Sequence, residues 1–502
     1  MRNPALTFAV ALLPVSFAGL MACSGAGQAA RRPQPEAAVE RCAAQKRAVA
    51  AAIADGSHTP IAMVALATAG TGAEPWTEAR AAERILAAPA GGESWVVARG
   101  GSGKSLLARH LEAQLCGERL TFRVDVGLDL RAQLETATPA KPAIARLLLA
   151  QLGQRGGDDP AGQLRDLLGS DPWLLLLDGT DELTQSERKK LNREVEWLRS
   201  AGFGQHIVRF ERPGMAEASG TQTPEVVLHL DDLTCAEADA AFARRLGDPA
   251  ALAPARAWLT AHRLDRQGAG EPCRYVHMPT HRDVEVLADL AKDAQAAGTD
   301  AQLSDDVARD PTRADIFATW SAHRLQGIAS TTEGALAWLD RIAAQGVVDK
   351  TEPDLRLTVN RCEGVATPGA IASGPACRQL MQSAVVRKSE ASGAATLANR
   401  TLADLLLARW LVRQQSDCAM LASAMGEMAS LEVAAMVASL PDGRRCLNPL
   451  VAAICSRGIP PADVLGFIDE AVPMGSRDAA FFAIAGERAH GACERKVFAG
   501  LK

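Results

Sequence analysis

The stretch Glu93–Ser105, ESWVVARGGSGKS, decides the fold class, because an apolar strand runs there into a glycine-rich turn and then into a helix. Gly100, Gly101 and Gly103 lack a Cβ atom, so backbone N–H groups at these positions can converge on a phosphate without obstruction. We expect these three glycines, together with Ser102, to form a phosphate-binding loop between a strand and a helix.

Two residues at the end of this loop are expected to bind the charged groups of a nucleotide and its metal. Lys104 would reach the β- and γ-phosphates of a nucleotide, Ser105 would bind Mg²⁺, and the following helix would direct its positive end at the anion. The usual pattern GxxxxGK[ST] begins with glycine, whereas this chain has Ala98 there. The predicted ligands are unaffected, because later residues make the cradle. For this motif alone, the alternative is a glycine-rich turn that binds no nucleotide.

A second motif, Trp173–Leu183, reads WLLLLDGTDEL. Its four consecutive leucines are typical of a central parallel strand that is buried on both faces. Asp178 ends this strand, where a carboxylate can hold the water shell of Mg²⁺ against the loop serine. Asp181 and Glu182 follow at the same strand end, and one of them could activate the attacking water as general base. The alternative is a solvated acidic turn after a core strand.

Short apolar runs alternate with helical patterns from about residue 91, which is typical of βαβ units around a parallel sheet. The predicted strands are 94–98, 120–126, 173–177, 206–211 and 226–230, and the predicted helices between them are 104–116, 141–152, 161–168 and 185–200. Helices are also predicted over 36–54 and 76–88, with loops between them. Beyond residue 231 the pattern is helical, except for one predicted strand over 355–359.

Composition narrows the function classes. Hydrophobic residues make up 48% of the 502 residues and aromatic residues only 4%, which excludes wholesale disorder and favours a core of Ala, Leu and Val in helices. The formal net charge of -5 gives no reason to expect a nucleic-acid partner. The motifs CxxC, HExxH and GxSxG do not occur, so the sequence predicts neither a zinc site nor a hydrolytic triad.

Residues 1–22 combine Arg2 with an uncharged apolar run from Pro4 to Leu20, which Pro14 interrupts. The run is short for a membrane span, so it predicts a signal peptide. The stretch 20–23, LMAC, resembles the lipobox of bacterial lipoproteins. This resemblance implies that Cys23 is acylated and tethers the protein to the cell membrane or outer membrane, facing the periplasm. The alternatives are a buried N-terminal hydrophobic helix, or a misread start codon in a cytoplasmic protein.

If Cys23 carries lipid, ten of the 11 cysteines remain, an even number that suits disulfides in an oxidising compartment. Cys362 and Cys377 bracket a short loop, and Cys446 lies close to Cys455 in sequence, so both are natural pairs. Connectivity cannot be deduced from sequence. The alternative is that several of these cysteines are small buried apolar residues.

The stretch 174–183, LLLLDGTDEL, resembles the Walker B signature of NACHT-type NTPases, which are nucleotide-controlled switches among the signal-transducing ATPases. The stretch 207–213, IVRFERP, is similar to the family's sensor strand, which implies that Arg212 lies near the γ-phosphate. Family members have small hydroxyl residues before this arginine, where this chain has Phe210 and Glu211. Met278-Pro279 is similar to the segment whose proline, here Pro279, lies against the adenine.

Two later stretches resemble the same family. TRADIFATW, before Ser321, is similar to the helix that opens the winged-helix region. NRTLADLLLARWL, over 399–411, resembles a family helix, with Asn399 in place of its histidine and Asp404 at its acidic position.

The resemblance implies an α/β P-loop NTPase core with a parallel sheet flanked by helices, followed by mostly α-helical and winged-helix subdomains. The expected parts are a signal peptide (1–22), a lipid-anchored tether (23–35), N-terminal helices (36–90), the NTPase core (91–232), a helical subdomain (233–310), a winged-helix and helical region (311–412) and a C-terminal helical tail (413–502).

The resemblance further implies a membrane-tethered switch that binds ATP and Mg²⁺ and hydrolyses ATP slowly. Nucleotide would control the conformation of the chain or its assembly into a homo-oligomer. Two alternatives stay open at this point. One is an exported interaction lipoprotein with a catalytically idle NTPase fold, since ATP is scarce outside the cytoplasm. The other is a cytoplasmic NACHT signalling or defence ATPase whose apparent signal peptide is misread.

Overall fold

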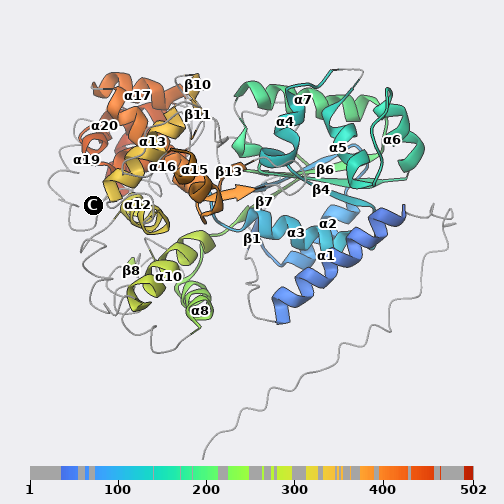
Figure 1. Ribbon diagram of the computed structural model, residues 1–502, viewed down its shortest axis with the longest axis horizontal. Coiled ribbons are helices and arrows are strands. Elements are labelled where there is room, and N and C mark those ends of the chain that lie inside the picture. The colour runs from blue at the N-terminus through green and yellow to red at the C-terminus, as the bar shows by residue number, and fades with distance from the viewer. Residues whose placement is uncertain are drawn as a thin grey trace, which may run out of the picture. The chain divides into compact units, whose positions relative to one another are not determined.

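The computed structural model describes residues 35–54, 63–66, 74–138, 141–169, 171–183, 185–212, 224–247, 263–264, 273–275, 280–296, 312–325, 332–344, 347–349, 352–353, 362, 373–388, 395–398, 400–415, 417–427, 431–456, 464 and 491–500 (Figure 1). Several sequence predictions therefore lie outside the described residues. These are the signal peptide, the acylation of Cys23, the placement of Pro279 and Asn399, and the strand predicted over 355–359.

Seven strands form one sheet in the order β2-β1-β7-β3-β6-β5-β4. Their bounds are β1 Met63–Leu66, β2 Glu74–Trp76, β3 Glu93–Val97, β4 Thr121–Asp125, β5 Trp173–Asp178, β6 Gln205–Glu211 and β7 Val226–Leu230. The five strands β3 to β7 run parallel to one another. This confirms the predicted α/β class and the five predicted strands, each within one residue at either end.

The strands β1 and β2 were not predicted, and the prediction of a loop was wrong for Glu74 and Pro75, which belong to β2. The two strands are four and three residues long, and β2 contains Pro75, so neither shows a strand pattern of its own. β1 pairs antiparallel with β7 and β2 pairs antiparallel with β1. The pairing edge of β7 therefore determines their conformation, which a local pattern does not reveal.

Helices cover both faces of the sheet, as the alternating leucines of β5 require. Leu174 and Leu176 pack with α2 (Glu78–Ala87) and α3 (Lys104–Leu115) in one apolar cluster. Leu175 and Leu177 point to the other face and pack with α5, α6 and α7. Those helices span Ala143–Gln151, Pro160–Leu168 and Gln185–Ser200, and the short segments η1 (Val126–Leu130) and α4 (Arg131–Leu134) follow β4 (Figure 1). α1 (Glu36–Ala54) packs on α3.

The strand order places the candidate site. Because β3, β5 and β6 are parallel, their carboxyl ends meet at one edge of the sheet. β6 lies between β3 and β5, so the residue after β6, Arg212, emerges between the glycine loop and Asp178. Ligands bind at this edge in open parallel sheets.

Beyond β7 the described chain is mostly helical, as predicted. Its helices are α8 Cys235–Leu246, α10 His281–Ala296, α12 Arg313–Arg324, α13 Thr332–Ala344, α15 Ser373–Gln382, α16 Arg400–Gln414, α17 Cys418–Glu427, α18 Leu431–Ser439, α19 Pro441–Arg444, α20 Leu447–Cys455 and α23 Ala492–Gly500. Short antiparallel pairs join β8 (Arg263–Leu264) to β9 (Arg274–Tyr275), β10 (Val347–Asp349) to β11 (Glu352–Pro353) and β12 (Val386–Lys388) to β13 (Ala395–Leu397). No helix in the described part of the chain is long and apolar enough to cross a membrane.

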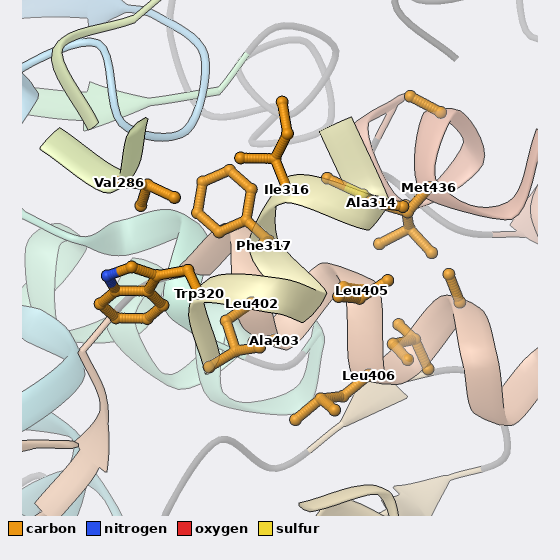
Figure 2. Packing of buried hydrophobic residues seen from close by; sticks show 14 of the residues in the cluster. Val286, Ala314, Ile316, Phe317, Trp320, Leu402, Ala403, Leu405, Leu406 and Met436 are labelled. Atoms are coloured by element: carbon orange, nitrogen blue, oxygen red, sulfur yellow. The ribbon is translucent and has the colours of Figure 1, made fainter. Parts of the chain in front are cut away.

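One apolar core joins α12, α16 and α18. Figure 2 shows Phe317 and Trp320 of α12, Leu402 and Leu405 of α16, and Met436 of α18 in this core, where all five are buried. Capping boxes define the starts of two helices, with Thr234 and Thr312 as the N-cap residues of α8 and α12. The shared core places the polar residues of α16 and α18 at defined positions.

Five disulfides pair all ten cysteines that follow Cys23. They are Cys42–Cys116, Cys235–Cys273, Cys362–Cys377, Cys418–Cys446 and Cys455–Cys493. The natural pair Cys362–Cys377 is confirmed. The pair Cys446–Cys455 was wrong, because these residues are the N-cap and the last residue of α20 and so lie about 13 Å apart along its axis. A disulfide requires Cα atoms closer than about 7 Å.

Proteolytic peptide mapping without reductant tests this connectivity. We expect cross-linked peptides that join Cys418 to Cys446 and Cys455 to Cys493, and we expect them to separate on reduction. A peptide with an internal Cys446–Cys455 bond would contradict the helix α20 as described. Alkylation of the unfolded, unreduced protein serves as a control, since it would leave these four cysteines unlabelled.

Candidate phosphate-binding site

The loop between β3 and α3 has the backbone that its glycines predict. Gly101 and Gly103 have φ angles of 85° and 99°, which side chains rarely tolerate. A Cβ atom on Gly100 would lie 2.6 Å from Nη2 of Arg212, and one on Gly101 would lie 2.6 Å from Cβ of Arg282. Glycine is therefore required both by the turn and by the close approach of neighbouring segments.

Lys104, the first residue of α3, is buried beneath this loop. Its Nζ donates hydrogen bonds to the carbonyl oxygens of Ala98 and Arg99, at 2.7 and 3.0 Å, and lies 3.9 Å from Oδ2 of Asp181. Burial lowers the pKa of Lys104, against the opposing effect of Asp181. Asp181 is the one carboxylate of the described residues that pairs with Lys104 within 4 Å, and the ammonium group lines the cavity, where it can attract an anion.

Ser105 and Asp178 lie together, as predicted. The Ser105 hydroxyl donates a hydrogen bond of 2.9 Å to Oδ1 of Asp178, while Oδ2 of Asp178 is buried and accepts no hydrogen bond. Burial raises the pKa of Asp178 to about 6, and Asp125 adds to the shift. Hydroxyl and carboxylate oxygens suit Mg²⁺, which usually takes few protein ligands and keeps several waters. The two side chains therefore fit a magnesium ion, although the described residues hold no cluster of three or more His, Cys, Asp or Glu that suits a metal.

Arg212 follows β6 and is fully buried among three carboxylates. Its Nε donates to Oδ2 of Asp181 at 2.6 Å, and its Nη1 donates to Oδ2 of Asp404 at 2.8 Å. Nη1 also lies 3.3 Å from Oε2 of Glu432, whereas Nη2 is buried without a hydrogen-bond partner and faces Gly100. Burial opposes the charge, but Asp404, Glu432 and Asp181 together raise the pKa of Arg212 well above its ordinary value.

The two acidic residues after β5 have opposite environments. Burial raises the pKa of Asp181, but Lys104 and Arg212 outweigh it and bring the value down to about 2. Burial raises the pKa of Glu182 to about 7, although Arg387 of β12 opposes this shift and donates to both carboxylate oxygens at 3.2 and 3.0 Å. At neutral pH, Asp181 is therefore a fixed anion, whereas Glu182 can exchange a proton.

These groups surround one cavity of about 440 Å³. Of the residues that the sequence predicted for the site, its lining includes Gly100, Gly101, Gly103, Lys104, Ser105, Asp178, Asp181, Glu182 and Arg212. Ser102 is buried in the loop, where its hydroxyl donates to the carbonyl of Arg99, and it does not line the cavity. The position of Pro279 lies outside the described residues.

The sequence analysis missed four arginines of the cavity, Arg109, Arg282, Arg387 and Arg400. Arg387 lies on a three-residue strand that is part of no motif, and Arg282 lies in the first turn of α10. Arg400 directly follows the family-like position Asn399, which is the one sequence signal that could have pointed to it. Folding brings these side chains from distant parts of the chain to the phosphate loop.

No protein-family model matches this chain, and no curated protein matches it. Among solved structures the chain is similar to the Orc1 protein of Aeropyrum pernix in complex with DNA. The two share 14% sequence identity at a TM-score of 0.32, over 67% of this chain and 93% of that chain. A likeness this distant adds nothing to the geometry of the site, which stands by itself.

Glu211, the last residue of β6, is a further buried acid beside the site, and its Oε2 has no hydrogen-bond partner. Burial raises its pKa to about 7 against the opposing charge of Arg209. Between its ordinary value of 4.5 and about 7, the folded protein holds a proton that the unfolded chain has released. Glu211 therefore makes stability rise as the pH falls through this window.

We predict that Glu211→Gln is more stable than wild type at about pH 8 and depends less on pH. The unfolding free energies should differ in slope by about 1.4 kcal/mol per pH unit between the two pKa values, measured by urea denaturation. The pH profile of the variant must be compared with that of wild type, because His206 also makes stability depend on pH. Burial lowers the pKa of His206, so its contribution to stability increases as the pH rises, opposite to that of Glu211. Parallel pH profiles for wild type and Glu211→Gln would show that Glu211 does not hold this proton.

Proposed function

We propose that this chain is a P-loop NTPase that binds a nucleoside triphosphate, in the first place ATP, with Mg²⁺. The observation that carries the proposal is the meeting of three groups in one cavity. These are a glycine loop with positive φ angles, the buried ammonium group of Lys104, and Asp178, whose second oxygen accepts no hydrogen bond. Such a set suits a triphosphate and its metal, because backbone N–H groups and an ammonium group attract phosphate oxygens, while the carboxylate of Asp178, which lies 3.5 Å from Nη1 of Arg123, can also attract a metal ion.

The roles of the residues follow from their positions. Gly100, Gly101 and Gly103 would supply backbone N–H groups to the phosphates, and Lys104 would add a positive charge. Ser105 and Asp178 would hold Mg²⁺, which would supply a positive charge against the phosphate oxygens when bound. Arg212 would meet the terminal phosphate through Nη2, which lies against the loop and has no hydrogen-bond partner.

We further propose that Glu182 is the general base. Asp181 is bound to Arg212 and has a pKa of about 2, so it is a weak base. Glu182 has a pKa of about 7, near the value that suits proton transfer at neutral pH. Arg387 orients its carboxylate in this structure through two hydrogen bonds.

Lys104→Ala tests nucleotide binding. We expect the variant to lose measurable affinity for Mg–ATP in calorimetry, because the cavity loses its buried ammonium group. Lys141→Ala is the matched control, since Lys141 lies on the surface in an exposed pair with Asp158 and should leave affinity unchanged. Equal ATP affinity in wild type and Lys104→Ala would overturn the proposal.

Glu182→Gln tests the chemistry separately from binding. The variant should bind Mg–ATP within a few-fold of wild type and hydrolyse it about 10²–10⁴-fold more slowly, the usual contribution of a general base. In wild type the rate of phosphate release should increase with pH through about 7, because only the ionised carboxylate accepts a proton. If Glu182→Gln hydrolyses ATP at a rate close to that of wild type, Glu182 is not the general base.

The site supports a switch of the NACHT type, in which nucleotide controls subdomain arrangement or homo-oligomer assembly. Arg212 of the core contacts Asp404 of α16 and Glu432 of α18, so a ligand that engages Arg212 would change what holds the helical region. We propose that the core over 91–232 is extended by β1, β2 and α2, which belong to the same sheet and its apolar cluster. The helical subdomain over 233–310, the winged-helix region over 311–412 and the tail over 413–502 would follow it.

We also propose that the protein is an exported lipoprotein anchored through Cys23 and facing the periplasm. Five disulfides support export, because they persist in oxidising compartments and are rare in the cytoplasm. They also oppose the cytoplasmic alternative. Because ATP is scarce outside the cytoplasm, export keeps the second candidate open, an interaction lipoprotein whose NTPase fold is idle.

Intact mass of the native protein tests export. We expect the mass to lack residues 1–22, to include acyl groups, and to increase by about two mass units per disulfide on reduction. Cys23→Ser should move the protein from the membrane fraction to the soluble fraction, because the proposed anchor is the lipid on this cysteine. An unprocessed and fully reduced chain would instead favour a cytoplasmic protein.

A further inference from the structure

The phosphate loop already contacts an anion that belongs to the chain. The backbone N–H of Gly100 donates a hydrogen bond of 3.2 Å to Oε1 of Glu432, which lies 332 residues away in sequence. The other carboxylate oxygen, Oε2, lies 3.3 Å from Nη1 of Arg212. A carboxylate of α18 thus occupies one donor that the proposed function assigns to phosphate, the N–H of Gly100, and pairs with the guanidinium group of Arg212, whose Nη2 is the other.

The charges around Glu432 support its role as an anion bound at the loop. Burial disfavours the ionised form of Glu432, but Arg212, Arg99 and Lys104 outweigh it and lower its pKa to about 2. Glu432 is therefore an anion at any physiological pH, although its residue is only 6% exposed. A buried carboxylate that accepts a hydrogen bond from a backbone N–H and lies among several cations has the same environment as an oxygen of a bound phosphate.

The helix that carries Glu432 is held firmly in place. Val433, Met436 and Val437 of α18 are buried in the apolar core that α18 shares with α16, part of which Figure 2 shows. The disulfide Cys418–Cys446 joins the segments on both sides of α18, since Cys418 begins α17 and Cys446 caps α20. Glu432 cannot leave the loop by a local rotation of a surface side chain, so its release requires movement of α18 or of its neighbours.

We propose that Glu432 is a built-in competitor for the phosphate cradle, and that a triphosphate binds only by displacing it from Gly100 and Arg212. The inference rests on the proposed function and adds that Glu432 regulates binding at the same site. Occupation of the cradle by Glu432 lowers the apparent affinity for triphosphate, because only the fraction of molecules with α18 displaced is competent to bind. Binding is thereby coupled to the position of α18 and of the helices packed on it.

The test compares Mg–ATP affinity in wild type, Glu432→Gln and Asp340→Asn, measured by calorimetry on the full oxidised chain. Glutamine keeps the size of Glu432 but not its charge, so we expect at least tenfold tighter binding. Asp340→Asn is the matched control, because Asp340 is also a buried carboxylate of the helical region, paired with Arg409 and Arg413 away from the loop. Its affinity should equal that of wild type.

Hydrogen exchange on the wild-type protein gives a second readout that needs no variant. Amides of α18 (Leu431–Ser439) should exchange faster when Mg–ATP is added, because displacement of Glu432 frees the helix. Inorganic tripolyphosphate with Mg²⁺ should have the same effect if the phosphate chain alone competes. Unchanged or slower exchange in α18 at saturating Mg–ATP would overturn the inference.

The outcomes separate this inference from the function on which it rests. Binding by wild type with equal or weaker binding by a folded Glu432→Gln variant would overturn the competitor role and leave the NTPase proposal intact. If neither wild type nor Glu432→Gln binds Mg–ATP while circular dichroism shows both folded, the NTPase proposal itself fails. Binding by Glu432→Gln alone would support both.

Discussion

The buried guanidinium group of Arg212 is the interaction on which the arrangement of this protein depends. It contacts Asp181 of the nucleotide core, Asp404 of α16 and Glu432 of α18, and all four side chains are nearly inaccessible to solvent. A buried charge is costly unless it is paired and hydrogen-bonded, so each partner must stay in place for the others to be tolerated. This requirement links the end of β6 to two helices that lie about 200 residues further along the chain.

The same cluster explains why the site and the helical region cannot be understood separately. In this structure Glu432 accepts the N–H of Gly100 and pairs with Nη1 of Arg212, next to Nη2, the donor proposed for phosphate. Arg387 of β12 likewise donates a hydrogen bond to Glu182, the proposed base. Core residues thus carry the proposed chemistry, and residues beyond β7 contact them directly. Five disulfides join segments of this arrangement.

Much of the core could be predicted, because its signals are local. The leucines of β5 alternate between the two helix-covered faces, and Gly101 and Gly103 before Lys104 have the positive φ angles that glycine allows. The strands β1 and β2 could not be predicted, since β1 pairs with β7 and β2 pairs with β1, and this pairing determines their conformation. The pair Cys446–Cys455 failed for a similar reason. Proximity in sequence becomes distance in space when a helix lies between two residues.

The sequence by itself determined the α/β class, the phosphate loop and the set Lys104, Ser105, Asp178, Asp181 and Glu182. These follow from periodicity and from residue types at fixed spacing, which a chain carries without its fold. Only the tertiary structure decided that Asp181 is engaged by Arg212 while Glu182 has a raised pKa. It alone placed Arg387, Arg400 and Glu432 at the loop. The physical reason is that burial and neighbouring charge set the state of an ionisable group, and both come from packing between distant segments.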